Sequence, residues 1–74
     1  MFTPAQLRGA RAQLGWSQDD LARASLGSRP TIADSELGKR VPHDRTIAEI
    51  VRALESAGIR FVGATGVEMR SNRQ

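Results

Sequence analysis

The chain has 74 residues, enough for one domain with a modest core and too few for two. It has no cysteine, so no disulfide can add stability, and a partner subunit is the obvious remaining aid. Eleven Lys+Arg against eight Asp+Glu give a net charge of +3, and ten of the eleven cations are arginine. Arginine suits phosphate and guanine contacts, although this net charge also suits any small soluble protein.

The N-terminus lacks the charged and then apolar layout of a signal peptide, and the apolar runs are only a few residues long. We therefore expect a cytoplasmic protein that does not enter a membrane.

A first helix is predicted from Thr3 to Leu14. Thr3 is a capping residue, Pro4 fits the first helical position, and Gln6 stands three residues after the cap. Gly15 then offers a C-terminal stop. The expected apolar stripe consists of Leu7, Ala10 and Leu14.

Two short helices should follow, at about Gln18 to Ser25 and about Pro30 to Leu37. Ser17 and Ser28 are their capping residues, and Gly38 marks the end of the second. The residues expected to face the core are Leu21, Ala24 and Ile32. Two short helices joined by a tight turn within about twenty residues have the spacing of a helix-turn-helix motif.

A fourth helix is predicted from a cap at Asp44 to Ala57. Apolar residues recur on one side at helical spacing, with charged residues on the other. They are Ile47, Ile50, Val51, Leu54 and Ala57.

After Gly58 the apolar period changes from 3.6 residues to 2, which indicates strands. The alternating residues are Ile59, Phe61, Val67 and Met69. Residues 63–66 fit a hairpin loop, although a single edge strand or a frayed tail would also fit. We thus divide the chain into a helical domain at 1–58, a strand or hairpin at 59–70 and a disordered tail at 71–74.

Three segments in the helical part of the chain stand out: WSQDDLA at 16–22, SRPTIA at 28–33, and ELGK at 36–39 followed by Pro42. In this order and spacing they resemble the Cro/C1-type (Xre) family of transcriptional regulators. The resemblance extends from about Leu7 to Gly58. It implies a mainly α, four-helix, lambda-repressor-like fold that binds double-stranded DNA as a homodimer and needs no cofactor. It further implies a pseudo-palindromic operator with helix three in the major groove.

The resemblance also assigns roles to individual residues. Base contacts fall to Arg29, Pro30 and Asp34. Phosphate contacts fall to Gln18, Thr31, Lys39, Arg40 and Arg45. Gln18 is also implied to brace the recognition helix. Arg11 and Glu36 match a position pair that forms a partly buried ion pair.

The chemistry of the three base-contacting positions agrees in part with those roles. Arg29 suits a guanine, the Pro30 ring suits a thymine methyl, and Asp34 suits the amino group of cytosine. An unpaired Asp34 would instead repel phosphate.

The sequence departs from the family pattern at three positions. Leu26 and Gly27 stand as though exchanged, because a small residue or glycine usually precedes a buried apolar one there. Ser35 replaces a large apolar residue, and a partner surface or Leu37 is expected to fill the missing volume.

An enzyme is not expected, because one histidine, no cysteine and scattered carboxylates offer neither an activated nucleophile nor a metal cluster. The serious rival is a protein-binding antitoxin or antiactivator on the same fold. For the homodimer we expect a shared sheet built from Ile59, Phe61, Val67 and Met69, which would also cover helix four. The competing hypothesis is that the hairpin folds back on its own domain and helix four forms the dimer.

Overall fold

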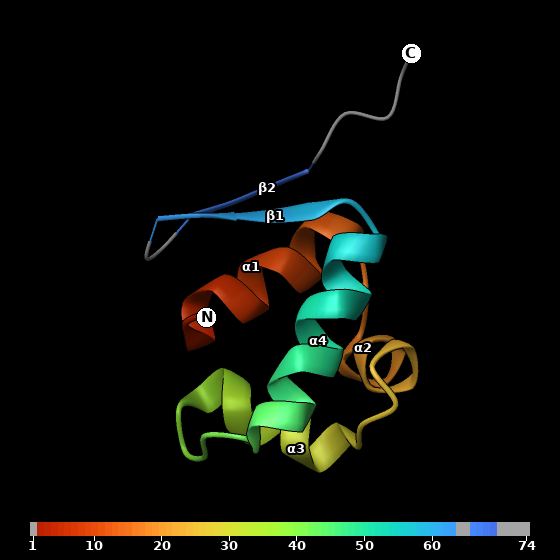
Figure 1. Cartoon of the computed structure of the whole chain (residues 1–74), viewed down its shortest axis with the longest axis vertical. Coiled ribbons are helices and arrows are strands. Elements are labelled where there is room, and N and C mark those ends of the chain that lie inside the picture. The colour runs from red at the N-terminus through yellow and green to blue at the C-terminus, as the bar shows by residue number, and fades with distance from the viewer. Residues whose placement is uncertain (1, 64–65, 70–74) are drawn as a thin grey trace.

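The computed structural model describes residues 2–63 and 66–69, in which four helices are followed by an antiparallel hairpin (Figure 1). The elements are α1 (Pro4–Leu14), α2 (Gln18–Ala24), α3 (Arg29–Leu37), α4 (Asp44–Ser56), β1 (Ile59–Val62) and β2 (Gly66–Met69). The predicted mainly α helix-turn-helix fold with a C-terminal hairpin is confirmed. The predicted tail at 71–74 lies outside the described residues, as do loop residues 64 and 65.

Side-chain caps start the first three helices where the sequence places them. Thr3 and Ser17 each form a capping box, with Gln6 and Asp20 respectively, and Ser28 accepts a hydrogen bond from the Thr31 amide. The fourth cap differs from the prediction. His43 is the N-cap of α4 and makes no side-chain cap bond, whereas Asp44 is already helical. The extended backbone therefore ends one residue earlier than expected.

The core lies between the helices and the inner face of the hairpin. Its buried members are Leu7, Ala10, Leu21, Ala22, Ile32, Ile50, Leu54 and Ile59. The core side of α2 differs from the prediction, because Ala22 is buried and Ala24 is only half-buried. α2 packs against both α3 and α4, so two neighbouring positions face the interior. On α4, Ile47 and Val51 are half-buried, at the margin of the core.

The turn between α2 and α3 contains a strained leucine. Leu26 has a φ of 59° and is 81% exposed. The Leu26 amide donates to the Arg23 carbonyl and the Gly27 amide to the Ala22 carbonyl, which is the Schellman arrangement that usually places glycine at the left-handed position. The exchange of Leu26 and Gly27 noted in the sequence therefore puts a β-carbon where the backbone disfavours one.

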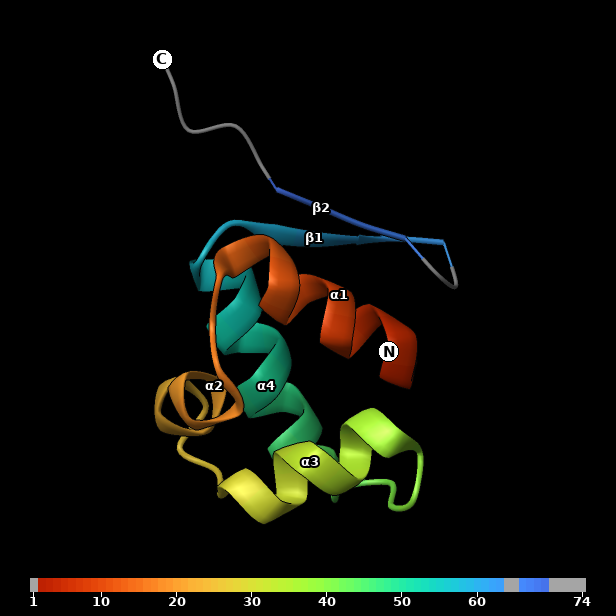
Figure 2. The ribbon, with the colours of Figure 1, turned by 180° about the vertical axis from the view of Figure 1, so that it is seen from behind.

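The hairpin folds back on its own domain, with β1 against α4 and β2 against α1 (Figure 2). Ile59 pairs with Met69 and Phe61 with Val67, so these four side chains share one face. Phe61 and Val67 pack against the core, and the Phe61 ring stacks on Phe2 with centroids 5.9 Å apart. The single-strand and frayed-tail alternatives are thereby excluded.

One buried side chain ties the hairpin to α1. The Gln6 amide nitrogen donates to the carbonyl oxygens of Gly63 (3.0 Å) and Gly66 (2.9 Å), and Gln6 is only 1% exposed. Because a buried amide without partners is costly, these bonds hold the ends of the hairpin loop in place.

Candidate nucleic-acid interface

The recognition helix of the predicted motif, α3, lies at the end of the molecule opposite the hairpin (Figures 1 and 2). Ile32, Ser35 and Glu36 form its buried side. The predicted base-contacting residues lie on the other side, where Arg29 and Pro30 are exposed and Asp34 is half-buried. Helical spacing puts Pro30 and Asp34 on the same face, one turn apart. The exposed side of α3 is thus the side that could enter a groove.

An ion pair fixes α3 to α1. The Arg11 guanidinium donates through Nε to Glu36 Oε2 at 2.7 Å and through Nη2 to Oε1 at 3.0 Å. The side chains of Arg11 and Glu36 are 23% and 3% exposed. The hydrogen bonds to Glu36 raise the pKa of Arg11 above its ordinary value. The geometry is that of the partly buried pair implied by the family resemblance.

Two further side chains and one further backbone carbonyl join this ion pair. Gln18 donates its amide nitrogen to Glu36 Oε1 at 3.2 Å, which braces the start of α2 against α3. The third Arg11 nitrogen donates to the Trp16 carbonyl at 2.9 Å, and Arg8 donates to the Glu36 carbonyl. The contact of Arg8 was not predicted, since nothing in the local pattern distinguishes it from a solvated arginine.

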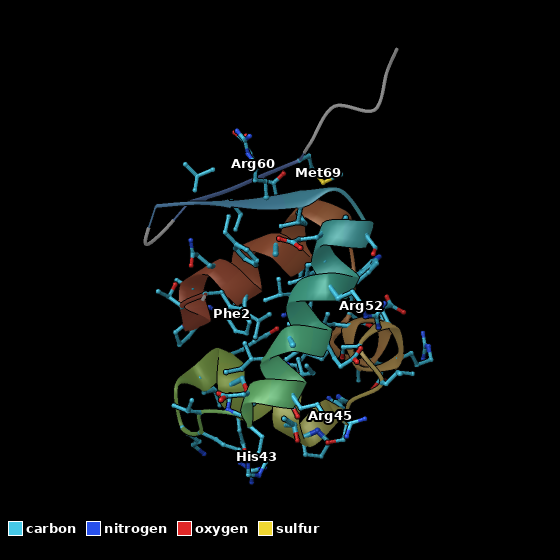
Figure 3. The ribbon with its side chains drawn as sticks, viewed as in Figure 1. Phe2, His43, Arg45, Arg52, Arg60 and Met69 are labelled. Atoms are coloured by element: carbon cyan, nitrogen blue, oxygen red, sulfur yellow. The ribbon has the colours of Figure 1, made fainter. Side chains whose placement is uncertain are left out.

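The exposed cations predicted to contact phosphate gather near the α3 end. Lys39 and Arg40 follow α3, and Arg45 is in the first turn of α4, where Figure 3 places it beside His43. Arg40 Nη2 lies 3.6 Å from Asp34 Oδ2. Asp34 is therefore paired, which removes the expected repulsion of phosphate by an unpaired carboxylate. Thr31 and Arg40 both line a hollow of about 290 Å³.

A second carboxylate at this end was not among the predicted site residues. Asp19 Oδ1 lies 3.7 Å from Arg29 Nε, which links the first turn of α2 to the first turn of α3. The sequence shows Asp19 only as one of two acidic residues at a helix start, a pattern explained by the helix dipole alone.

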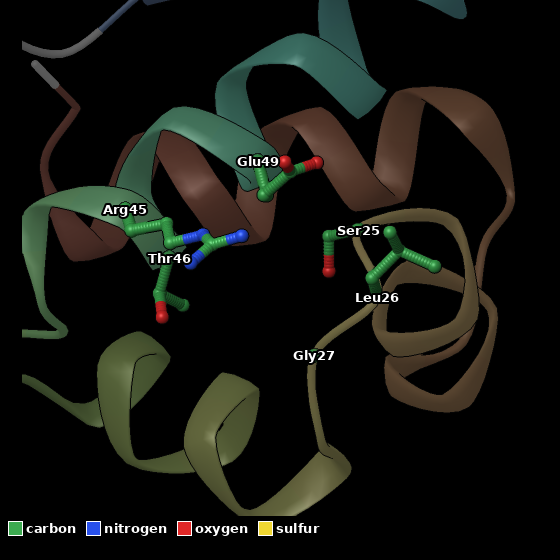
Figure 4. A pocket seen from close by; sticks show the side chains of 6 residues that line it. All are labelled: Ser25, Leu26, Gly27, Arg45, Thr46 and Glu49. Carbon is green, nitrogen blue, oxygen red and sulfur yellow. The ribbon is translucent and has the colours of Figure 1, made fainter.

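The departures from the family pattern leave hollows beside α3. A pocket of about 260 Å³ separates the α2–α3 turn, at Ser25 to Gly27, from Arg45, Thr46 and Glu49 of α4 (Figure 4). Ser35, the third departure from the family pattern, is buried and donates its hydroxyl to the Thr31 carbonyl at 2.8 Å. A mainly apolar pocket of about 140 Å³ lies next to Ser35. The expectation that Leu37 fills this volume is wrong, because Leu37 points away from the core and is 67% exposed.

Other kinds of site find no support in the described residues. Within residues 2–63 and 66–69, His, Asp and Glu side chains nowhere form a group of three that could hold a metal ion. In the same ranges, no helix has both the length and the apolar character needed to span a membrane.

Residues 5–60 match the family model of the helix-turn-helix domain, and this range covers α1 from its second residue, the whole of α2, α3 and α4, and the first two residues of β1. The chain belongs to this family. No curated protein matches the sequence. Membership of this domain family, together with an exposed α3, points to DNA binding as the general activity.

Proposed function

We propose that the chain is a transcriptional regulator of the Cro/C1-type (Xre) group. It binds a pseudo-palindromic operator as a homodimer, with α3 in the major groove. The observation that carries this proposal is the first turn of α3. Its Arg29 side chain is 65% exposed on a helix that the buried Glu36 holds rigidly against α1. An exposed arginine on a fixed helix start has the reach to contact a base edge.

The base contacts follow from the chemistry of the exposed face. Arg29 donates two parallel hydrogen bonds to guanine O6 and N7, the Pro30 ring packs against a thymine methyl, and Asp34 accepts from cytosine N4. Asp34 and Arg40 form a partly exposed ion pair at 3.6 Å, which opens when Arg40 contacts a phosphate and Asp34 contacts a base.

The phosphate contacts surround this face. The proposed contacts are Gln18, Thr31, Lys39, Arg40 and Arg45. They position the protein without selecting a sequence, and the three cations among them, Lys39, Arg40 and Arg45, account for the salt dependence expected of the complex.

The hairpin is the proposed dimer element, with Ile59, Phe61, Val67 and Met69 as its residues. Its inner face already covers the chain's own domain, so pairing between chains has to use a strand edge. Each strand has one neighbour in this two-stranded sheet, so the hairpin keeps an outer edge with which a second chain can pair. A two-fold axis normal to the sheet would make one continuous sheet from the hairpins of both subunits, and it would keep both α3 helices at the same end of the dimer. Both helices could then contact one operator.

The test is to select binding sites from a pool of random duplexes. A two-fold symmetric sequence is expected, with half-site centres one helical turn apart, about 34 Å, or a multiple of it. Failure to enrich any sequence would contradict the proposal. It would favour the protein-binding antitoxin or antiactivator, for which Leu26 and Val41 (81% and 76% exposed) are apolar side chains open to contact with a protein partner.

A further inference from the structure

The end of the molecule that carries Arg29 also carries a carboxylate with no role in the interface described above. Asp19 is at the second position of α2, and its Oδ1 lies 3.7 Å from Nε of Arg29. Both side chains are well exposed, at 62% and 65%. We propose that Asp19 determines specificity: it positions Arg29 for a guanine and discourages Arg29 from binding a backbone phosphate. The inference rests on the proposed DNA-binding function.

Asp19 is not needed to cap its own helix. The Ser17 hydroxyl accepts from the Asp20 amide at 3.0 Å, and the Asp20 carboxylate accepts from the Ser17 amide at 2.9 Å. This capping box already satisfies the reciprocal bonds of the helix start, and Asp20 also pairs with Arg23 at 2.6 Å. A further carboxylate adds at most a dipole interaction, at an end of α2 that faces the proposed phosphates.

The geometry leaves Arg29 able to bind a base. Asp19 contacts the guanidinium at Nε, so the two terminal nitrogens stay available for the parallel bonds that guanine O6 and N7 accept. The contact joins α2 to α3, and because both side chains are exposed it is weak, so it favours one orientation of the arginine without fixing it. Restricting a flexible side chain beforehand reduces the entropy lost when it binds.

The charge of Asp19 acts differently on the two kinds of DNA contact. A phosphate that approaches Arg29 also approaches a carboxylate within a few ångströms, where repulsion between like charges is only partly screened. A guanine edge presents neutral acceptors, and it can bind the terminal nitrogens while Asp19 stays in place. Asp19 therefore weakens binding to arbitrary sequence more than binding to a site with the correct guanine.

The experiment compares the full chain with Asp19→Asn on two probes, the duplex selected above and a mixed-sequence duplex of equal length. Asp19→Asn should bind the mixed-sequence probe about 3- to 10-fold more tightly, and the affinity ratio between the probes should fall by about fivefold or more. Glu49→Gln makes the same charge change in the Arg52–Glu49 pair on α4, outside the proposed DNA contacts and the proposed dimer element, and it should leave the ratio unchanged. Asp19→Glu keeps the charge and should retain most of the ratio.

A double variant separates positioning from a general effect of charge. In an Arg29→Ala background, Asp19→Asn should no longer alter the ratio, because the side chain that it positions is gone. The inference is overturned if Asp19→Asn shifts both affinities equally, as is expected of Glu49→Gln, or if it lowers only the melting temperature. If the unmodified chain binds all duplexes equally well, the proposed function is contradicted, and so is this inference, which depends on it.

Discussion

Arg11 of α1 and Glu36 of α3 are joined by two parallel hydrogen bonds of 2.7 and 3.0 Å, and the Glu36 side chain is almost wholly buried. A buried carboxylate is tolerated only when its charge is compensated, and here Arg11 and Gln18 supply the donors. The pair therefore sets the position of the recognition helix relative to the first helix.

Arg11→Ala should lower the free energy of unfolding by roughly 3 kcal/mol, because it leaves the Glu36 charge buried without its main partner. Glu36→Ala should cost a similar amount. Urea denaturation monitored by circular dichroism measures both effects. Arg52→Ala is the matched control, because Arg52 and Glu49 form an exposed pair on α4 that should contribute well under 1 kcal/mol. Equal, small losses in all three variants would show that the Arg11–Glu36 pair is an ordinary surface pair.

Arg29→Ala should cost roughly 1 to 3 kcal/mol of binding to the selected duplex and should relax the preference at one base pair. Lys39→Ala and Arg40→Ala should instead weaken binding to all duplexes alike. Each should also make the slope of log affinity against log salt concentration shallower by about one unit. The two patterns are distinguished by titrating each protein variant against the selected duplex and its single-base variants, at a series of salt concentrations. The roles of base contact and phosphate contact would be reversed if Arg40→Ala lost affinity at one base pair only and Arg29→Ala lost it equally on all duplexes.

Leu26→Gly should stabilise the chain by about 1 kcal/mol. The left-handed backbone costs a residue with a β-carbon roughly that much, and the leucine side chain gains little from packing at 81% exposure. Gly15→Ala is the control, because it makes the opposite change: it adds a β-carbon at a left-handed position. Gly15 has a φ of 68° with open space around its missing β-carbon, so this change should destabilise by backbone strain alone. Thermal melts of the two variants should therefore shift in opposite directions, and a lower melting temperature for Leu26→Gly would contradict the argument.

Local signals in the sequence predicted the helices and hairpin because each element carries its own start, stop and period. The cap at Thr3 and the alternation from Ile59 are examples. The exchange of Leu26 and Gly27, which is a property of one turn, was identified by comparison with the family pattern. What they could not supply depends on distant parts of the chain. The bonds from Gln6 to Gly63 and Gly66 are an example, since a residue assigned to a helix cap also anchors the hairpin loop.

The candidate site was predictable to a similar extent. The exposed position of Arg29 follows from the start of α3, whereas its carboxylate partner Asp19 belongs to another helix and becomes visible only when the two helix starts are brought together. The volume next to Ser35 was also misassigned, although helical spacing argues against Leu37: it stands two residues, or about 200°, beyond the buried Ser35.

The capping box of α2 should make stability depend on pH in the acid range. The hydrogen bond from the Ser17 amide holds the pKa of Asp20 below its ordinary value of about 3.9. The stabilisation is therefore fully present above that ordinary value and is lost as the pH falls through the lower value of the folded state. Asp20→Asn should differ most from the unmodified chain at neutral pH, and the difference should shrink below about pH 4.

Ser17→Ala is the control for this pH dependence. It removes the hydroxyl, at a cost of about 1 kcal/mol, but keeps the backbone amide that binds Asp20. The Ser17→Ala variant should therefore be less stable at every pH but should still lose stability in acid as the unmodified chain does. Denaturation at a series of pH values measures both, and an acid profile of Asp20→Asn that matches the unmodified chain would rule out this role for Asp20.

Truncation after Gly58 and Phe61→Glu should each give monomers or largely unfolded chains with much weaker binding to a full operator. Both changes also disturb the chain's own core, because Ile59 is 2% exposed and Phe61 stacks on Phe2. Loss of folding alone would therefore not locate the dimer interface. Variants at positions that are exposed within one chain are needed.

Met69→Glu and Ala48→Glu provide that distinction. Met69 is 44% exposed at the end of β2, and Ala48 is exposed in a groove on the outer side of α4, so neither change should unfold the domain. If the hairpins pair across a two-fold axis, a charge at Met69 should lower the dimer fraction at micromolar concentration, whereas Ala48→Glu should leave it unchanged. Sedimentation equilibrium measures the masses. The opposite outcome, with Ala48→Glu monomeric and Met69→Glu dimeric, would assign the interface to α4, and a truncated chain that remains a well-folded dimer would exclude the hairpin altogether.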